Sequence, residues 1–405
     1  MLTLLAALVA GPAGARAVGM PGLAAAARSI LGADQGVYVE AADGRSLLAQ
    51  AAAKAVHPAS VSKVPTTLAL LRRLGPGYRF TTLFAGTGPI EEGTLQGDLV
   101  VSSDGDPYFV DENAVLVAER LNEMGIRKVA GQLQLRGSLT FDWQDDPGAV
   151  RLRQALSGSA PSAAWAAVRG TDAAPAPDGG MPLVRFLGAA ASAEPRVAGP
   201  TGARPLVIHR SQPLLALAKA LNDYSNNIFK PLADAAGGAA AVEALARSVV
   251  PSAMRAEITL GDGAGTDPRN RLSPRAAVKL LRALEQELAA SGHTLVDILP
   301  VAGIDEGTLR RRLNAPEDSG RVVGKTGTYG DYGASAIIGA IATRDQGTVY
   351  FAILNHGVPV PEARRRQDRF LHVLLASVQS TTWPYQRDAL PAVARAEALP
   401  AGATP

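Results

Sequence analysis

The stretch "AVHPASVSKVPTTLALL", residues 55–71, decides the fold, because it places Ser60 three residues before Lys63 where an apolar helix begins. Positions i and i+3 of a helix share a face, so the hydroxyl and the amine come within hydrogen-bond reach. A serine hydroxyl becomes a nucleophile when a base removes its proton, and a lysine can be that base because burial lowers its pKa. Arginine stays protonated and cannot do so. The pattern indicates a serine nucleophile with a lysine base.

Lysine is scarce in this chain, with only 7 among the 40 basic residues. None of the other lysines has Ser or Thr three residues before it. Even so, a chain of ordinary composition and this length contains about one Ser-x-x-Lys by chance. The motif therefore needs support from elsewhere in the sequence.

Pro65 is unusual within the predicted helix. It has no N–H to donate to the carbonyl of Val61, so it disturbs a helix that starts near Ser60. We therefore expect an open or 3₁₀-like first turn.

A second motif is Tyr224-Ser225-Asn226-Asn227, in which a hydroxyl and a carboxamide lie two residues apart. Such a pair can pass a proton and hold a peptide group of a substrate. Taken alone, it is also typical of a helix cap or a turn, since Ser and Asn favour both.

A third motif comprises Lys325, Thr326, Gly327 and Thr328 within a β-type sequence. Glycine on both sides of Lys-Thr lets another backbone approach a strand edge closely, and the lysine with two hydroxyls forms a corner for a carboxylate. Taken alone, it also fits an exposed strand end.

The order and spacing of the three motifs carry more information than each motif alone. Ser225 follows Ser60 by 165 residues, and Lys325 follows Asn227 by 98 residues. This is the ordered signature of penicillin-recognising serine acyltransferases.

With these motifs the chain resembles the D-alanyl-D-alanine carboxypeptidases and endopeptidases of the penicillin-binding protein 4 type (low-molecular-mass class C), over most of residues 20–380. Further similar segments are "GDLVVSSDGDPYF" (97–109), "GIRKVAGQLQLRGSLTFD" (125–142), "LGDGAGTDPRNRLSP" (260–274) and "LPVAGIDEGTLRRRL" (299–313). Serine β-lactamases lack a domain inserted between the first two motifs.

The resemblance implies a mixed α/β fold: a β-lactamase/transpeptidase-like domain, with an antiparallel sheet flanked by helices, interrupted by a smaller β-rich domain. We expect residues 18–80 and 205–385 to form the catalytic domain and residues 81–204 the insertion. The short insertion, with its Ala/Gly/Pro-rich stretch 157–205, predicts a reduced subdomain and a loose connection. The tail 386–405, rich in Ala and Pro, is expected to be mobile.

The resemblance also implies a role for each motif residue. Ser60 is expected to be acylated, with Lys63 as its base and Ser225 as the proton shuttle to the leaving D-alanine. The substrate-binding set is Asn227 for an amide and Lys325, Thr326, Gly327 and Thr328 around the terminal carboxylate. The N–H groups of Ser60 and Thr328 would form the oxyanion hole.

The implied activity is penicillin-sensitive hydrolysis by a serine-type D-Ala-D-Ala carboxypeptidase or endopeptidase. Its implied partners are peptidoglycan stem peptides ending in D-Ala-D-Ala, with β-lactams as covalent inhibitors. The sequence does not distinguish removal of terminal D-alanine from cleavage of cross-links, because both reactions end in hydrolysis of the same acyl-enzyme. A catalytically quiet, peptidoglycan-binding member of the fold is the alternative. No oligomeric state is implied.

The N-terminus predicts export. Residues 1–17 contain a ten-residue apolar run and Ala-x-Ala sites, which indicate a signal peptide too short to be a stable membrane span, although no Lys or Arg precedes the run. We therefore expect a periplasmic protein.

Composition excludes several other classes. A net charge of +3 without a basic run longer than residues 364–366 argues against nucleic acid, and the absence of Cys excludes thiolate catalysis. Gly261, Gly263 and Gly265 miss the dinucleotide fingerprint, whose third glycine is required where Thr266 stands. We expect no metal and no cofactor, since the histidines show no ligand spacing: His57, His209, His293, His356 and His372.

Overall fold

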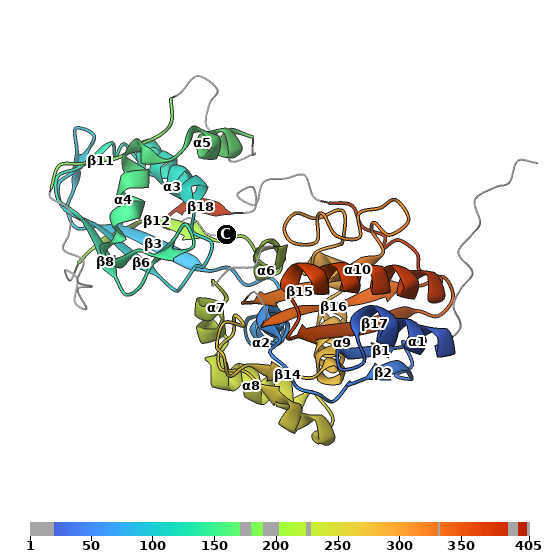
Figure 1. Cartoon of the computed structure of the whole chain (residues 1–405). Coiled ribbons are helices and arrows are strands. Elements are labelled where there is room, and N and C mark those ends of the chain that lie inside the picture. The colour runs from blue at the N-terminus through green and yellow to red at the C-terminus, as the bar shows by residue number, and fades with distance from the viewer. Residues whose placement is uncertain are drawn as a thin grey trace, which may run out of the picture.

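The computed structural model describes residues 20–170, 180–188, 202–223, 228–330, 333–387 and 396–402. Figure 1 shows two lobes, a larger lobe built from both ends of the chain and an inserted lobe built mainly from the green and cyan middle. The predicted signal peptide, residues 1–17, lies outside the described ranges. Within those ranges, no helix has the length and apolar character needed to cross a membrane.

A five-stranded sheet forms the centre of the larger lobe, in the order β15-β16-β17-β1-β2. Every neighbouring pair is antiparallel. Strands β1 and β2 pair on either side of Asp43-Gly44, and an Asp-Gly pair between two β-type stretches is typical of such a hairpin turn. The strands are β1 (Gly36–Glu40), β2 (Ser46–Gln50), β15 (Val322–Tyr329), β16 (Ala334–Ala342) and β17 (Thr348–His356).

Helices cover both faces of this sheet. This explains why its central strands carry apolar residues on both faces. Along β16, Ile337 and Ile341 pack towards α1 (Met20–Leu31) and α10 (Val360–Ser377). Ile338 packs on the opposite face, with α2 (Lys63–Leu74) and α9 (Pro274–Ala290). Successive strand residues point to opposite faces, so both sets are buried. The mixed α/β class expected from the sequence is confirmed.

The other helices and short strands of the larger lobe form one group with α2 and α9. They are η1 (Ala59–Ser62), α2 (Lys63–Leu74), α6 (Leu214–Asp223), α7 (Phe229–Ala235), α8 (Ala239–Ser248), η4 (Ser252–Glu257), β13 (Ile258–Thr259), β14 (Arg271–Leu272), α9 (Pro274–Ala290) and η5 (Leu295–Asp297).

Pro65 has the local structure that we expected. The 3₁₀ turn η1 precedes α2, and Pro65 is the third residue of α2. The N–H groups of the first turn have no partner within their own helix, so a proline there removes little. Ser60 therefore lies in the 3₁₀ turn and Lys63 at the first helical residue.

The inserted lobe has its own sheet, in the order β18-β12-β3-β6-β8, and its own apolar core. A smaller sheet runs β11-β7-β5-β4. Its elements are β3 (Thr81–Gly86), β4 (Ile90–Glu91), β5 (Thr94–Leu95), β6 (Leu99–Ser103), α3 (Asp111–Glu123), β7 (Lys128–Val129), β8 (Leu133–Arg136), β9 (Thr140–Phe141), β10 (Gln144–Asp145), η2 (Pro147–Ala149), α4 (Val150–Gln154), η3 (Ala155–Ser159), α5 (Ser162–Arg169), β11 (Arg185–Phe186), β12 (Arg204–Arg210) and β18 (Glu397–Pro400).

Three expectations about segment boundaries require correction. Strand β12 was expected in the catalytic domain but pairs with β3 of the inserted lobe. The tail was expected to be mobile, yet β18 pairs with β12, which supplies backbone partners for both strands. The stretch 157–205 was expected to be a loose connection, but it contains α5 and β11, and Ala164 and Val168 of α5 are buried. The rest of that stretch falls largely outside the described residues.

Candidate active site

The backbone at Ser60 is enclosed by two glycines. A Cβ on Gly265 would lie 2.0 Å from the carbonyl oxygen of Ala59, and a Cβ on Gly327 would lie 2.9 Å from the nitrogen of Ser60. Any side chain at either position would therefore displace this turn. The close approach brings the start of α2, the loop after β13 and the end of β15 together.

Ala59 adopts a left-handed conformation, with φ of 49°, which is unfavourable for a residue with a Cβ. His57 supports it, because its Nδ1 accepts the N–H of Ala59 at 3.1 Å. The other ring nitrogen, Nε2, then donates to the carbonyl of Asp267 at 3.0 Å, and the ring stacks on Tyr329 at 3.9 Å. His57 therefore supports the backbone conformation next to Ser60.

The structure brings Ser60 and Lys63 into direct contact. Lys63 Nζ donates to Ser60 Oγ at 2.8 Å and to the carbonyl of Ala264 at 3.1 Å. Lys63 is only 1% exposed. Burial, and then the positive charge of Lys325, lower the pKa of Lys63 to about 7, while Asp262 opposes the shift. At neutral pH much of Lys63 is therefore an uncharged amine that can accept a proton.

The loop after β13 supplies the second partner of Lys63, the carbonyl of Ala264. Asp262 shapes this loop by accepting the N–H groups of Gly265 and Thr266 at 2.8 and 2.9 Å and the amide of Asn270 at 2.9 Å. Burial raises the pKa of Asp262, but these hydrogen bonds outweigh it and lower the pKa overall. In the sequence, the only signal for this segment was its resemblance to the family, which assigned no role to its residues.

The same loop excludes the alternative of a dinucleotide-binding motif. The glycines at 261, 263 and 265 follow the two-residue strand β13 and lead to β14 rather than to a helix. Without a helix N-terminus, this run has no place for a pyrophosphate.

The third motif lies on the edge strand β15. Lys325 is fully buried, and its Nζ donates to the carbonyl of Thr326 at 3.2 Å. Burial lowers the pKa of Lys325 to about 8, and the carboxylate of Asp223 opposes that shift. The hydroxyls of Thr326 and Thr308 lie 2.5 Å apart.

Thr328, three residues after Lys325, is exposed, and its hydroxyl accepts a hydrogen bond from Arg364 at 2.8 Å. Reasoning from the sequence missed both Thr308 and Arg364. Thr308 lies in a segment that carried the resemblance, and Arg364 belongs to the longest basic run, but neither feature indicated a neighbour on β15.

The second motif, with Ser225 and Asn227, lies outside the described residues, but its two flanks are described. The carbonyl of Asp223 accepts the N–H of Thr308 at 3.4 Å, and a Cβ on Gly307 would lie 1.7 Å from that carbonyl. On the other flank, the ring of Phe229 lies 5.3 Å from Lys63 Nζ. The described residues on either side of this motif therefore lie near Lys63 and near Thr308, whose hydroxyl contacts that of Thr326.

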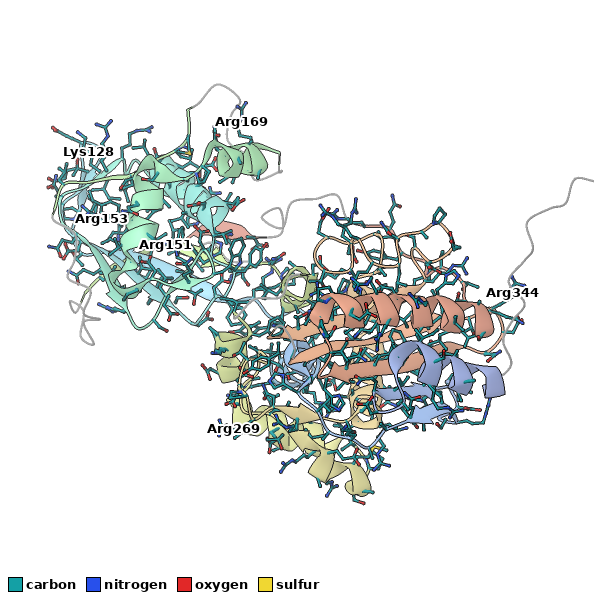
Figure 2. All side chains as sticks on the ribbon, viewed as in Figure 1. Lys128, Arg151, Arg153, Arg169, Arg269 and Arg344 are labelled. Atoms are coloured by element: carbon teal, nitrogen blue, oxygen red, sulfur yellow. The ribbon has the colours of Figure 1, made fainter. Side chains whose placement is uncertain are left out.

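The surface of the described residues includes two sizeable hollows. One of about 550 Å³ is lined by the loop after β13, including Asp262, Gly263 and Thr266, together with Lys230 and Asp234 of α7. It therefore adjoins the Ser60–Lys63 site. Arg269, labelled in Figure 2, pairs with Asp267 at this edge at 2.6 Å.

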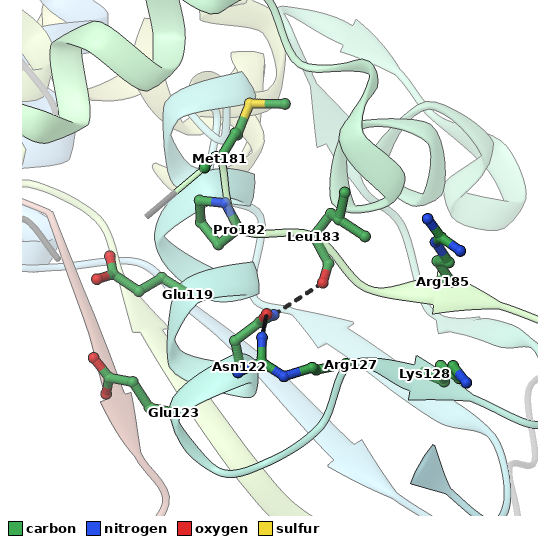
Figure 3. Close-up of a pocket in the computed structure, with 10 residues that line it drawn as sticks. Glu119, Asn122, Glu123, Arg127, Lys128, Met181, Pro182, Leu183 and Arg185 are labelled. Atoms are coloured by element: carbon green, nitrogen blue, oxygen red, sulfur yellow. Dashed lines mark hydrogen bonds between the residues drawn. The ribbon is translucent and has the colours of Figure 1, made fainter. Parts of the chain in front are cut away.

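The other hollow, of about 740 Å³, lies on the inserted lobe between the end of α3 and residues 180–185. Figure 3 shows Glu119 and Glu123 on one side and Lys128 and Arg185 on the other. None of the motif residues lines it. The described residues contain no cluster of three or more potential metal ligands.

Comparison with known proteins identifies the family of this chain. The sequence matches the D-Ala-D-Ala carboxypeptidase 3 (S13) family over residues 23–171 and 191–377. The carboxypeptidase DacB of Mycolicibacterium smegmatis is 26% identical over 399 residues, covering 87% of this chain and 82% of that protein. The D-alanyl-D-alanine carboxypeptidase DacB of Haemophilus influenzae is 33% identical over 81 residues, which cover 20% of this chain and 17% of that protein.

Solved structures show the same fold. The penicillin G-acylated predatory endopeptidase Bd3459 of Bdellovibrio bacteriovorus has a TM-score of 0.76 at 21% identity, covering 90% of this chain and 99% of that one. Penicillin-binding protein 4 of Haemophilus influenzae has a TM-score of 0.59 at 18% identity, covering 87% and 99%. The family match spans most of the chain, so this protein belongs to the D-Ala-D-Ala carboxypeptidase 3 (S13) family and is a D-Ala-D-Ala peptidase.

Proposed function

We propose that the protein hydrolyses peptidoglycan stem peptides through an acyl-enzyme on Ser60, and that β-lactams acylate the same hydroxyl. The observation that carries the proposal is the buried contact of 2.8 Å between Lys63 Nζ and Ser60 Oγ. A lysine with a pKa of about 7 in that contact is suited to take the hydroxyl proton.

In the proposed acylation, neutral Lys63 takes the proton of Ser60 while Oγ forms a bond to the carbonyl carbon of the penultimate D-alanine. The N–H groups of Ser60 and Thr328 stabilise the negative oxygen of the tetrahedral intermediate. The C–N bond then breaks, and Ser225 gives its proton to the amine of the leaving residue while it takes up the proton that Lys63 accepted, so Lys63 is neutral again. Water hydrolyses the resulting ester, which releases the shortened peptide and restores Ser60.

Substrate binding is assigned to the second and third motifs. Asn227 would hold a backbone amide of the stem peptide, and Lys325, Thr326 and Thr328 would hold the terminal carboxylate along the edge of β15. Gly327 keeps the strand close to Ser60, as its missing Cβ indicates. The family's action on the cell wall, together with the apolar N-terminus, supports export to the periplasm.

The test uses fluorescent penicillin on the full chain. Wild-type protein is expected to become labelled, and Ser60→Ala to lose the label while keeping the same thermal melting curve. Ser62→Ala, two residues away in the same turn, is the matched control and should keep the label. Folded wild-type protein that takes up no label would overturn the proposal and favour a catalytically quiet, peptidoglycan-binding protein. Digestion of cross-linked and uncross-linked muropeptides then distinguishes endopeptidase from carboxypeptidase action.

A further inference from the structure

Three consecutive arginines near the start of α10 have different surroundings. Arg365 and Arg366 both bind Glu362 on the preceding turn of the helix, Arg366 through Nε at 2.8 Å. Arg364 points to the sheet instead, and its Nη2 donates to Thr328 Oγ1 at 2.8 Å. Sequence alone does not separate the three residues, but their contacts do.

Among the described residues, no carboxylate lies at ion-pair distance from the guanidinium of Arg364. Asp368, one helical turn further on, is engaged by Arg312, whose Nη2 and Nε lie 2.6 and 2.9 Å from Oδ1. Arg364 is also exposed, so its remaining N–H groups are accessible to a ligand.

The bond from Arg364 constrains the hydroxyl of Thr328. Arginine can only donate, so Thr328 Oγ1 accepts here and its own proton must point elsewhere. That proton is available to a second acceptor beyond the edge of β15. Thr328 and Arg364 together therefore present an O–H donor and a positive charge at the end of the strand that carries Lys325.

We propose that Arg364 is a positioning residue that orients the Thr328 hydroxyl and, with it, selects substrates whose leaving residue carries a free α-carboxylate. This inference rests on the proposed function, because it concerns the carboxylate of the same substrate. A charge-assisted hydrogen bond is stronger than a neutral one, and solvent exposure at Arg364 weakens it, so we expect a selectivity of about tenfold from it.

The test compares two thioester substrates that share an acyl-D-alanyl part. In one, the leaving group is a mercapto acid with a free carboxylate; in the other, it is the corresponding amide. Thioesters are reactive enough for both substrates to be turned over. Wild-type enzyme should prefer the acid, and Arg364→Gln should lower kcat/KM for the acid about tenfold while leaving kcat/KM for the amide unchanged. Arg364→Lys should restore part of the preference.

Arg365→Gln and Arg366→Gln are the matched controls, since they remove the same charge from the same helix without touching Thr328. They should keep the wild-type preference. The inference is overturned if Arg364→Gln keeps the preference, if it lowers both rates equally, or if wild-type enzyme does not distinguish the two substrates. Failure of the proposed function is distinct, because wild-type enzyme would then neither bind fluorescent penicillin covalently nor hydrolyse either thioester.

Discussion

Two regions of the larger lobe bury charged side chains, and they differ in what surrounds the charge. At the edge of β15, Lys63 and Lys325 are buried, and no carboxylate among the described residues forms an ion pair with either. Across the sheet, Glu40 is also buried, but Lys279 lies 2.6 Å and Arg282 2.7 Å from its oxygens. Tyr38 adds a hydrogen bond to Glu40 at 2.9 Å.

The difference distinguishes a buried charge that stabilises the fold, at Glu40, from a buried group suited to proton transfer, at Lys63. Around Glu40 the opposite charges compensate for the loss of water, so an ionised side chain can be buried there. Lys63 forms no ion pair with a described carboxylate, and burial, with the charge of Lys325, lowers its pKa to about 7 although Asp262 opposes part of the shift. An uncompensated lysine gives up its proton more readily, and that is the property that a general base needs.

The largest effect is expected from a substitution that keeps a positive side chain at position 63 but removes its ability to give up a proton. Lys63→Arg should reduce the rate of acylation by penicillin about 1000-fold or more, because a guanidinium stays protonated and cannot accept the proton of Ser60. Stopped-flow or gel-based labelling measures the rate. Lys128→Arg is the matched control, because Lys128 is an exposed lysine on the inserted lobe, at its far end in Figure 2.

The Lys63 variant should remain folded, as far-UV circular dichroism and melting can check. Labelling of folded Lys63→Arg at the wild-type rate would remove Lys63 from the role of base. The contrast with Glu40 would then fail, because burial of a lysine without an ion-pair partner would not make that lysine a base.

The next effect concerns the compensated charge. Glu40→Gln leaves Lys279 and Arg282 facing each other without their carboxylate, and should lower the free energy of unfolding by about 3 kcal/mol. Urea denaturation followed by circular dichroism measures it. Glu287→Gln, which removes a partly exposed partner of Arg72, should cost about 0.5 kcal/mol. Equal losses in the two variants would contradict the structural reading of the Glu40 cluster, as would slower penicillin acylation in folded Glu40→Gln.

Local features of this fold were predictable because neighbouring residues determine them. The turn at Asp43-Gly44 and the 3₁₀ start before Pro65 follow from backbone chemistry within a few residues. The contact between Ser60 and Lys63 follows from helical spacing in the same way. The joint role of the three motifs required the known order of a family, because nothing local relates residues that lie 98 or 165 positions apart.

Long-range contacts at the site were missed for the same reason. Ala264 carries no side-chain signal for its bond to Lys63, since the acceptor is a backbone carbonyl present in every residue. Arg364 has two identical neighbours, and only the packing of α10 on the sheet determines which one reaches Thr328. Strand β18 looked like a mobile tail by composition, because Ala and Pro are common there, yet it finds free backbone partners on β12.

The smallest expected effect concerns how the two buried lysines influence each other. Below a pH of about 7 Lys63 gains a proton and stops acting as a base, so acylation should fall about tenfold per pH unit. Above a pH of about 8 Lys325 loses its charge, so binding of the carboxylate should weaken. The second-order rate of acylation should therefore follow a bell shape between these two values, which belong to a coupled pair.

Lys325→Gln sharpens this expectation. The charge of Lys325 helps to lower the pKa of Lys63, so its removal should move the acidic limb towards higher pH and eliminate the basic limb. Burial of Lys63 remains the larger cause of its low pKa, so the acidic limb should move by about one pH unit or less. Lys128→Gln should leave both limbs in place. An acidic limb that stays fixed or moves to lower pH in Lys325→Gln would show that the two lysines do not share one electrostatic environment, and that burial alone makes Lys63 a base.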